Sequence, residues 1–130
     1  MSYSKEELSK YRIEHSKESL EEAKILGASG HWNTTANRLY YSCFYIASAY
    51  LVINGFKAST HAGTKKIFNK ELVANSLIDS SAGLLYNKLF NLRQDADYRD
   101  YSDVTQKEIE PMIEQVEELI QQMVDLIDKK

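Results

Sequence analysis

The run LYYSCFYIASAYLVI, residues 39–53, decides the fold of this chain. On a helix of about 3.6 residues per turn it places apolar or aromatic side chains on every face. A helix that is hydrophobic all round is buried all round. We therefore predict a central helix that its neighbours cover, or one that also forms a subunit interface. Either Asn33 or Thr34, both good N-caps, is expected to begin it. Asn54 and Gly55 are expected to end it.

A second helix is predicted at the N-terminus, before this central one. Ser4 and Glu7 have the spacing of a capping box, in which each side chain bonds to the backbone of the other residue. Gly27 and Gly30 are expected to stop this helix, because glycine favours the backbone conformation that ends helices. Its Glu-rich and Lys-rich surface predicts an outer helix with one apolar stripe turned inward.

Three further helices are predicted after the central one. A short helix is expected to follow Thr60, and a longer one is expected to begin at Asp79 or Ser80. The last helix has two possible starts: a capping box that opens at Thr105, or Pro111 in the first turn. Because proline cannot sit deep inside an unkinked helix, Pro111 predicts a bend or a late start.

Composition supports a single helical domain over residues 1–130. A chain of 130 residues and 15.0 kDa is long enough to bury a core. One proline and five glycines leave little material for the turns between many short strands. The predicted fold is therefore all-α, an up-and-down bundle of four long helices plus one short helix.

Charge, cysteine and histidine content exclude several classes of protein. The formal net charge of −3 argues against a strongly electrostatic nucleic-acid binder but leaves room for a local basic pocket. Cys43 stands alone, so it permits no intrachain disulfide and is expected to be a buried, inert thiol. His15 and His31 lack partners at ligand spacing, so neither a metal site nor a cofactor is predicted. The polar N-terminus and the lack of a spanning apolar run predict a cytoplasmic protein without membrane contact.

A charged pair on an apolar helix face is the first signal of function. In the helix after Ser80, Leu85, Leu89 and Leu92 form one stripe, and Arg93 and Asp97 project into the same arc. Burying these charges is costly, and perturbed charges cluster at functional sites. The pair is therefore either part of a functional site or a structural ion pair that fixes the helix register.

Other polar candidates lie near the central helix. Asn37 and Arg38 enter it just before Tyr40 and Tyr41, where they either line a polar hole in the bundle or reach water. His61 lies near the N-terminus of the short helix, where exposed amides suit an anion such as phosphate. The alternative is that His61 is an ordinary surface residue.

Three motifs, in order along the chain, carry a resemblance to a known family. The run ANRLYYSCF at residues 36–44 resembles the N-R-x-Y-Y-x-x-F helix of HEPN-domain proteins, which are small α-helical domains. Residues 55–68 match the family's G…T-H-x-G…F stretch. Residues 93–98 match the R-x-x-A-D-Y signature of one prokaryotic branch. The resemblance covers residues 11–123, which is nearly the whole chain.

The resemblance implies a helical bundle that is usually dimeric. Many relatives are ribonucleases or toxin-like components, often encoded beside a small nucleotidyltransferase that acts as partner or antitoxin. The active ribonuclease branch uses an arginine followed closely by a histidine, and the sites of two subunits meet at the dimer interface. No histidine follows Arg93 here. His61, the last histidine of the chain, can substitute only if the fold brings it beside Arg93.

The first predicted function is a nucleotide- or RNA-associated module that works with a nucleotidyltransferase-type partner in a toxin–antitoxin-like or defence system. Its arginines would hold phosphate or an acidic surface of the partner, with Asp97 orienting Arg93. The predicted ligand-binding residues are Asn37, Arg38, Tyr41, His61, Arg93, Asp97 and Tyr98.

The alternative function is a metal-independent ribonuclease toxin with an atypical site. Arg93 would stabilise the charge that develops on phosphate, while Tyr98 or His61 moves protons. Imidazole suits a general base near neutral pH far better than tyrosine, whose unperturbed pKa is about 10. Either function is expected of a homodimer.

Overall fold

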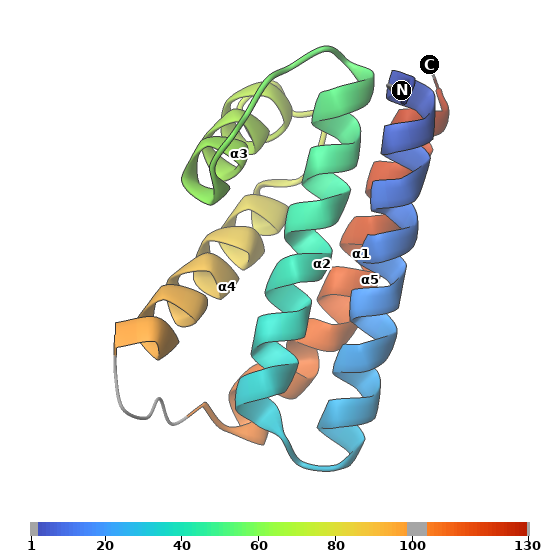
Figure 1. The fold of residues 1–130 in the computed structure, drawn as a ribbon. Coiled ribbons are helices and arrows are strands. Elements are labelled where there is room, and N and C mark those ends of the chain that lie inside the picture. The colour runs from blue at the N-terminus through green and yellow to red at the C-terminus, as the bar shows by residue number, and fades with distance from the viewer. Residues whose placement is uncertain (1–2, 99–103, 130) are drawn as a thin grey trace.

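The computed structural model describes residues 3–98 and 104–129, with side chains described for 3–93 and 104–129. Its elements are α1 (Lys5–Ala28), α2 (Trp32–Ile53), α3 (His61–Phe68), the π-helical turn η1 (Asn69–Val73), α4 (Ser80–Tyr98) and α5 (Gln106–Asp128). No strand occurs within these ranges, which confirms the all-α prediction. In Figure 1, α1, α2 and α5 run side by side, while α3 and α4 lie on the other side of α2.

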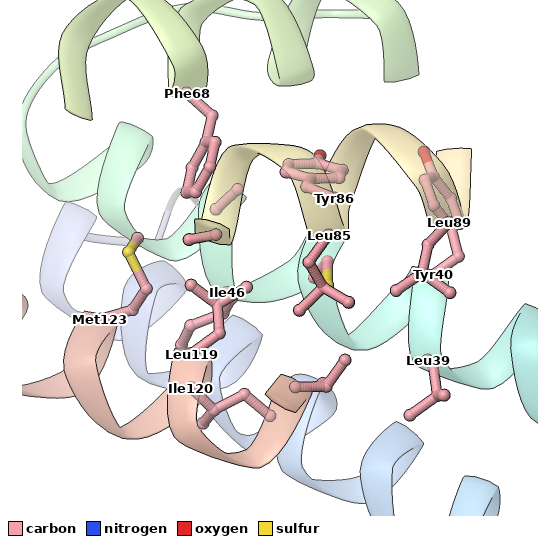
Figure 2. Packing of buried hydrophobic residues seen from close by; sticks show 14 of the residues in the cluster. Leu39, Tyr40, Ile46, Phe68, Leu85, Tyr86, Leu89, Leu119, Ile120 and Met123 are labelled. Carbon is pink, nitrogen blue, oxygen red and sulfur yellow. The ribbon is translucent and has the colours of Figure 1, made fainter. Parts of the chain in front are cut away.

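The central position predicted for residues 39–53 belongs to α2, which contacts α1, α3, α4 and α5. Leu39 and Ile46 are fully buried. Tyr41, Phe44 and Tyr45 are only half-buried, so one face of α2 stays partly open. Figure 2 shows the covered side, where α2 packs against residues of α4 and α5: Leu85, Tyr86, Leu89, Leu119, Ile120 and Met123.

Cys43 lies in this core and is fully buried, as expected. Burial raises the pKa of its thiol to about 12, so the thiol stays protonated near neutral pH. Among helices built from the described residues, none combines the length and the apolar character that crossing a bilayer requires.

The ends of α1 show one correct prediction and one correction. The capping box is present, with the Glu7 amide donating to Ser4 Oγ at 3.1 Å. Gly27 does not stop the helix, which continues to Ala28. A Cβ at Gly27 would lie 3.1 Å from the indole of Trp32, so the two helices approach closely at this residue. Gly30 has a φ of 80° and makes the turn.

The predicted start of α2 is wrong, because the helix begins at Trp32 and not after Asn33 or Thr34. His31 is the N-cap residue and makes no side-chain cap bond. Its carbonyl oxygen accepts from the Thr35 amide at 2.9 Å and from Thr35 Oγ1 at 2.8 Å.

The other helix ends follow the predictions more closely. At the far end of α2, Asn54 caps the helix and Gly55 has a φ of 80°, as predicted. The earlier of the two predicted starts of α5 is observed, since Thr105 Oγ1 accepts from the Glu108 amide at 3.2 Å. Pro111 therefore lies inside α5, and the late start is wrong.

Buried serines join α1 to α2, a feature that the sequence analysis did not anticipate. Ser16 Oγ donates to the carbonyl of Ser42 at 2.7 Å, and Ser42 Oγ donates back to the carbonyl of Ser16 at 3.0 Å. Further along the seam, Ser9 Oγ donates to the carbonyl of Ala49 at 3.0 Å. Small side chains that bond to the facing backbone let the two helices lie close together in one register.

Candidate functional site

The first turn of α3 places His61 against the open face of α2. Thr60 caps α3 by accepting from the Gly63 amide at 2.8 Å. The imidazole stacks on the ring of Phe44, with 4.3 Å between the centroids and 19° between the planes. The ring of Tyr41 lies edge-on to it at 5.9 Å. His61 is therefore wedged between two rings of α2 and is only half exposed.

A short hydrogen bond of 2.6 Å joins Tyr40 Oη to His61 Nδ1. Tyr40 is fully buried, and burial raises its pKa to about 12, against an opposing effect of the nearby Arg93. The phenol thus keeps its proton at neutral pH, and Nδ1 is its one hydrogen-bond partner among the described residues. In the tautomer whose hydrogen is on Nε2, Tyr40 donates to Nδ1; in the other tautomer Nδ1–H donates to Tyr40 Oη.

Two effects keep His61 neutral at pH 7. Burial lowers its pKa below the usual 6.5, and the positive charge of Arg93 lowers it further. Where Tyr40 donates to Nδ1, protonation of the imidazole would place a second hydrogen there and is disfavoured further. In that tautomer His61 offers its Nε2–H group as a hydrogen-bond donor.

Arg93 reaches from α4 to the same two tyrosines. Its guanidinium carbon lies 5.3 Å from the ring centroid of Tyr40 and 5.6 Å from that of Tyr41, which is cation–π range. The charge on the apolar face of this helix thus rests on aromatic rings of α2. The backbone of Asp97 and Tyr98 belongs to α4, but their side chains lie outside the described residues. The Arg93–Asp97 pair and a role for Tyr98 therefore stay predictions.

Arg38 also lies over the ring of Tyr41, with its guanidinium carbon 5.1 Å from the ring centroid. Asn37 holds it there, since Asn37 Oδ1 accepts from Arg38 Nη2 at 2.7 Å and from Nε at 3.2 Å. Among acidic side chains that the structure describes, Glu22 is the one that approaches either arginine, at 3.5 Å from Arg38. We call the assembled residues the donor cluster: Arg38, Tyr40, Tyr41, His61 and Arg93.

Charged donors outnumber acceptors in this cluster. Two guanidinium groups and the imidazole of His61 lie around the ring of Tyr41, and Glu22 offsets part of only one of the two charges. Guanidinium groups bind carboxylates and phosphates in a fork of paired hydrogen bonds. The arrangement thus suits an oxyanion. Among the residues described, no group of three or more His, Cys, Asp or Glu side chains is placed to hold a metal ion.

Sequence reasoning missed two members of this surface. It named Tyr40 only as a neighbour of Asn37, and it gave Phe44 no role beyond the family motif. Asn37, Tyr41 and Phe44 follow the i, i+4, i+7 spacing of one helix face, so helical projection alone points to Phe44. The bond from Tyr40 to His61 depends on the packing of α3 on α2, which no local pattern reveals.

Comparison with known proteins agrees with the motifs. The chain matches the model of the HEPN domain over residues 9–127, a range that contains the whole donor cluster. This chain belongs to the HEPN family. The resemblance read from residues 36–44, 55–68 and 93–98 is thereby confirmed.

Two relatives of this HEPN chain match most of its length. A protein of Thermotoga maritima named "UPF0332 protein" is 29% identical over 124 residues, covering 95% of this chain and 94% of the relative. A protein of Methanocaldococcus jannaschii named "Putative toxin MJ0142" is 32% identical over 109 residues, covering 84% of this chain and 74% of the relative.

Proposed function

We propose that this HEPN protein is a toxin-like module that binds a phosphate group of a nucleotide or of RNA at the donor cluster. The observation that carries the proposal is the bond of 2.6 Å from Tyr40 to His61, beside Arg93. With the hydrogen on Nε2, the imidazole is a third donor next to two guanidinium groups. Phosphate oxygens only accept hydrogen bonds, so they complement such a site. The Methanocaldococcus jannaschii relative named "Putative toxin MJ0142" supports the toxin-like part.

The proposal includes a partner. The family resemblance implies a nucleotidyltransferase-type protein encoded nearby, and Asp97 would orient Arg93 toward phosphate or toward an acidic surface of that partner. Residues 1–130 would act as one up-and-down bundle of four long helices plus the short α3. Co-expression with the product of the neighbouring reading frame tests this part. We expect the two proteins to co-purify and growth inhibition by the HEPN protein to be relieved.

Calorimetry with ATP, GTP and short RNA tests the phosphate site. A hydrogen bond to a charged group contributes about 1.5–3 kcal/mol, so Arg93→Gln and Arg38→Gln should each weaken binding about tenfold or more. Arg93→Lys should recover only part of the loss, because lysine keeps the charge but not the planar fork.

Lys24→Gln is the matched control for the loss of one positive charge. Lys24 pairs with Glu21 and Glu117 on an exposed surface formed by α1 and α5, and among the described residues its hydrogen bonds and ion pairs go to these two carboxylates. Its substitution should leave binding unchanged. Wild-type protein that binds none of the three ligands would remove the proposal.

Metal-independent RNA cleavage is the second candidate, and the neutral His61 beside Arg93 favours it. It needs the other tautomer, in which Nδ1 carries the hydrogen and Nε2 accepts a proton from a ribose 2′-hydroxyl. The 2′-oxygen attacks the adjacent phosphorus, the bond from phosphorus to the 5′-oxygen of the next nucleotide breaks, and a 2′,3′-cyclic phosphate forms. The departing 5′-oxygen takes a proton and leaves as a hydroxyl group. We expect cleavage to persist in EDTA and to disappear in Arg93→Ala and in His61→Gln. Intact RNA after incubation with wild-type protein would contradict this candidate and leave phosphate binding untouched.

A further inference from the structure

A recess at the end of α2 lies apart from the donor cluster. It has a volume of about 320 Å³ and is formed by α1, the last turns of α2, the first turns of α3 and the segment 54–60, which leads from α2 to α3 (Figure 1). We call it the Arg12 recess. It shares no lining residue with the donor cluster, and its lining includes Arg12, Leu51, Val52, Phe56, Lys57 and Thr64.

The floor of the Arg12 recess is apolar, and the turn that ends α2 holds it in place. The Gly55 amide donates to the carbonyl of Val52 at 3.2 Å, and the Phe56 amide donates to the carbonyl of Leu51 at 2.9 Å. Together with the φ of 80° at Gly55, these bonds form a Schellman motif, which folds the chain back over the end of the helix. Leu51 is buried, whereas Val52 and Phe56 are half-buried. A ligand that covers these two side chains removes apolar surface from water.

Arg12 brings a half-buried positive charge to this recess. Its guanidinium donates to the carbonyl of Ser48 at 3.4 Å, a long bond that engages one of its five N–H groups. No carboxylate lies on α1 at the spacing of an ion pair with Arg12. The residues three and four positions away are Leu8, Ser9, His15 and Ser16. Because a partly buried cation without a carboxylate is costly, an anion beside Arg12 would be stabilising.

Lys57 adds a second positive charge to the lining. In residues 3–93 and 104–129, ion pairs are formed by Lys24 and Arg38, and none involves Arg12 or Lys57. Within the same ranges no acidic side chain lines the recess. The Arg12 recess thus combines an apolar floor with two cations, although the formal net charge of the chain is −3.

The lining limits the chemistry of a ligand. Small-molecule sites typically have volumes of about 300–1,000 Å³, so this recess takes a small ligand. Among the described residues it offers no Asn, Gln, Asp or Glu side chain that could read the edge of a nucleobase. Apolar walls with a few charged groups that orient the ligand suit a molecule with one anionic group and an apolar body. A guanidinium pairs with a carboxylate through parallel hydrogen bonds.

We propose that the Arg12 recess is a binding site for a small carboxylic acid with an aliphatic or aryl body. The carboxylate accepts hydrogen bonds from Arg12, the charge of Lys57 attracts it, and the body covers Val52 and Phe56. This site goes beyond the proposed function and does not depend on it, because the two sites share no residue. The end of a peptide chain carries similar chemistry and is the competing occupant.

NMR titration of the full chain with 4-methylpentanoate and 3-phenylpropanoate tests the site, with the methyl groups of Leu51 as the local probe. Both acids should shift these signals to saturation. The uncharged 4-methylpentanamide should bind about tenfold more weakly or less, because it lacks the anion. Arg12→Gln should weaken the acids about tenfold or more and leave the amide unchanged. Lys57→Gln should weaken them only about threefold, since Lys57 is exposed. Val52→Thr should weaken acid and amide alike, also by about threefold.

Arg38→Gln is the matched control, because it removes the same charged group from the donor cluster. It should bind both acids as the wild type does, and circular dichroism should show equal helix content in all variants. Equal affinity for acid and amide, or for wild type and Arg12→Gln, would overturn the site.

Two further probes distinguish other occupants of the Arg12 recess. Inorganic phosphate that shifts the Leu51 methyl signals at the same concentration as the acids would show that the apolar floor contributes nothing, and it would overturn the proposal. Acetyl-glycyl-leucine that binds where both free acids fail would assign the recess to a chain end and overturn the small acid. Either result leaves phosphate binding at the donor cluster standing, and loss of that function leaves the Arg12 recess standing.

Discussion

At the scale of single residues, the two candidate functions need different tautomers of His61. Phosphate binding uses the hydrogen on Nε2, and RNA cleavage needs it on Nδ1. In the first tautomer Tyr40 donates to Nδ1, and a bond to the neutral imidazole disfavours its protonation. Tyr40→Phe removes that bond, so we expect the pKa of His61 to rise. NMR titration of the imidazole carbon-bound protons measures it. A fall in the pKa would show that Nδ1 donates to Tyr40 and would favour the cleavage candidate.

The lowered pKa of His61 also makes the stability of the fold depend on pH. Because the folded state lowers the pKa of His61, this residue contributes stability that is present above about pH 6.5 and is lost as pH falls through the folded value. Urea unfolding of His61→Gln should lack this dependence. His31→Gln is the matched variant, since His31 is exposed and its side chain makes no cap bond. It should keep the dependence.

Some of these residues could be predicted from the sequence and others could not. Asn37, Arg38 and Tyr41 lie on one face of one helix, so spacing alone groups them. Whether His61 meets Arg93 depends on how α3 and α4 both pack on α2, which local periodicity does not encode. The roles of Asp97 and Tyr98 stay predictions, because their side chains lie outside the described residues.

At the scale of helices, Pro111 lowers the stability of α5. Beyond the first turn, proline lacks the N–H that would bond to the carbonyl of Lys107, and its ring crowds that carbonyl. Interior proline is about 3 kcal/mol less favourable than alanine in a helix, so Pro111→Ala should raise the free energy of unfolding by about 1–3 kcal/mol. Urea denaturation measures it.

Gln115→Ala, in the same helix, is the control and should change the free energy of unfolding by only about 0.3 kcal/mol. Lower stability in Pro111→Ala would mean that the ring stabilises the wall of the recess between α4 and α5, to which Pro111 belongs.

Some helix ends can be predicted from the sequence and others cannot. Ser4 and Thr105 cap through bonds to nearby backbone, which sequence shows. Trp32 starts α2 and covers Gly27, and that contact is tertiary.

At the scale of the whole molecule, the homodimer remains a prediction. It rests on the apolar α2, whose face at Tyr41, Phe44 and Tyr45 stays partly open, and on the family resemblance. Light scattering at micromolar concentration should give about twice 15.0 kDa. A monomeric mass at that concentration would contradict it. Repeating the measurement with Tyr45→Leu, and with Tyr3→Leu as the control at an exposed tyrosine, separates a dimer that uses the open face of α2 from one that does not.

Net charge gives no location for the donor cluster. A formal charge of −3 argued against a strongly electrostatic nucleic-acid binder and left room for a local basic pocket, because a sum over 130 residues carries no information on where charges lie. Arg38 and Arg93 are far apart in sequence, and only the packing of α4 on α2 brings both to the ring of Tyr41. The helices could be predicted because periodicity is local. The donor cluster could not, because it is assembled from α2, α3 and α4.

The paired serine bonds between α1 and α2 oppose the sliding of one helix along the other. A shift by a single turn would break both bonds between Ser16 and Ser42 at once. His61 and Arg93 belong to α3 and α4, which take no part in these bonds. We therefore expect that a change in the spacing of the donor cluster comes from α3 and α4, while α1 and α2 keep their register.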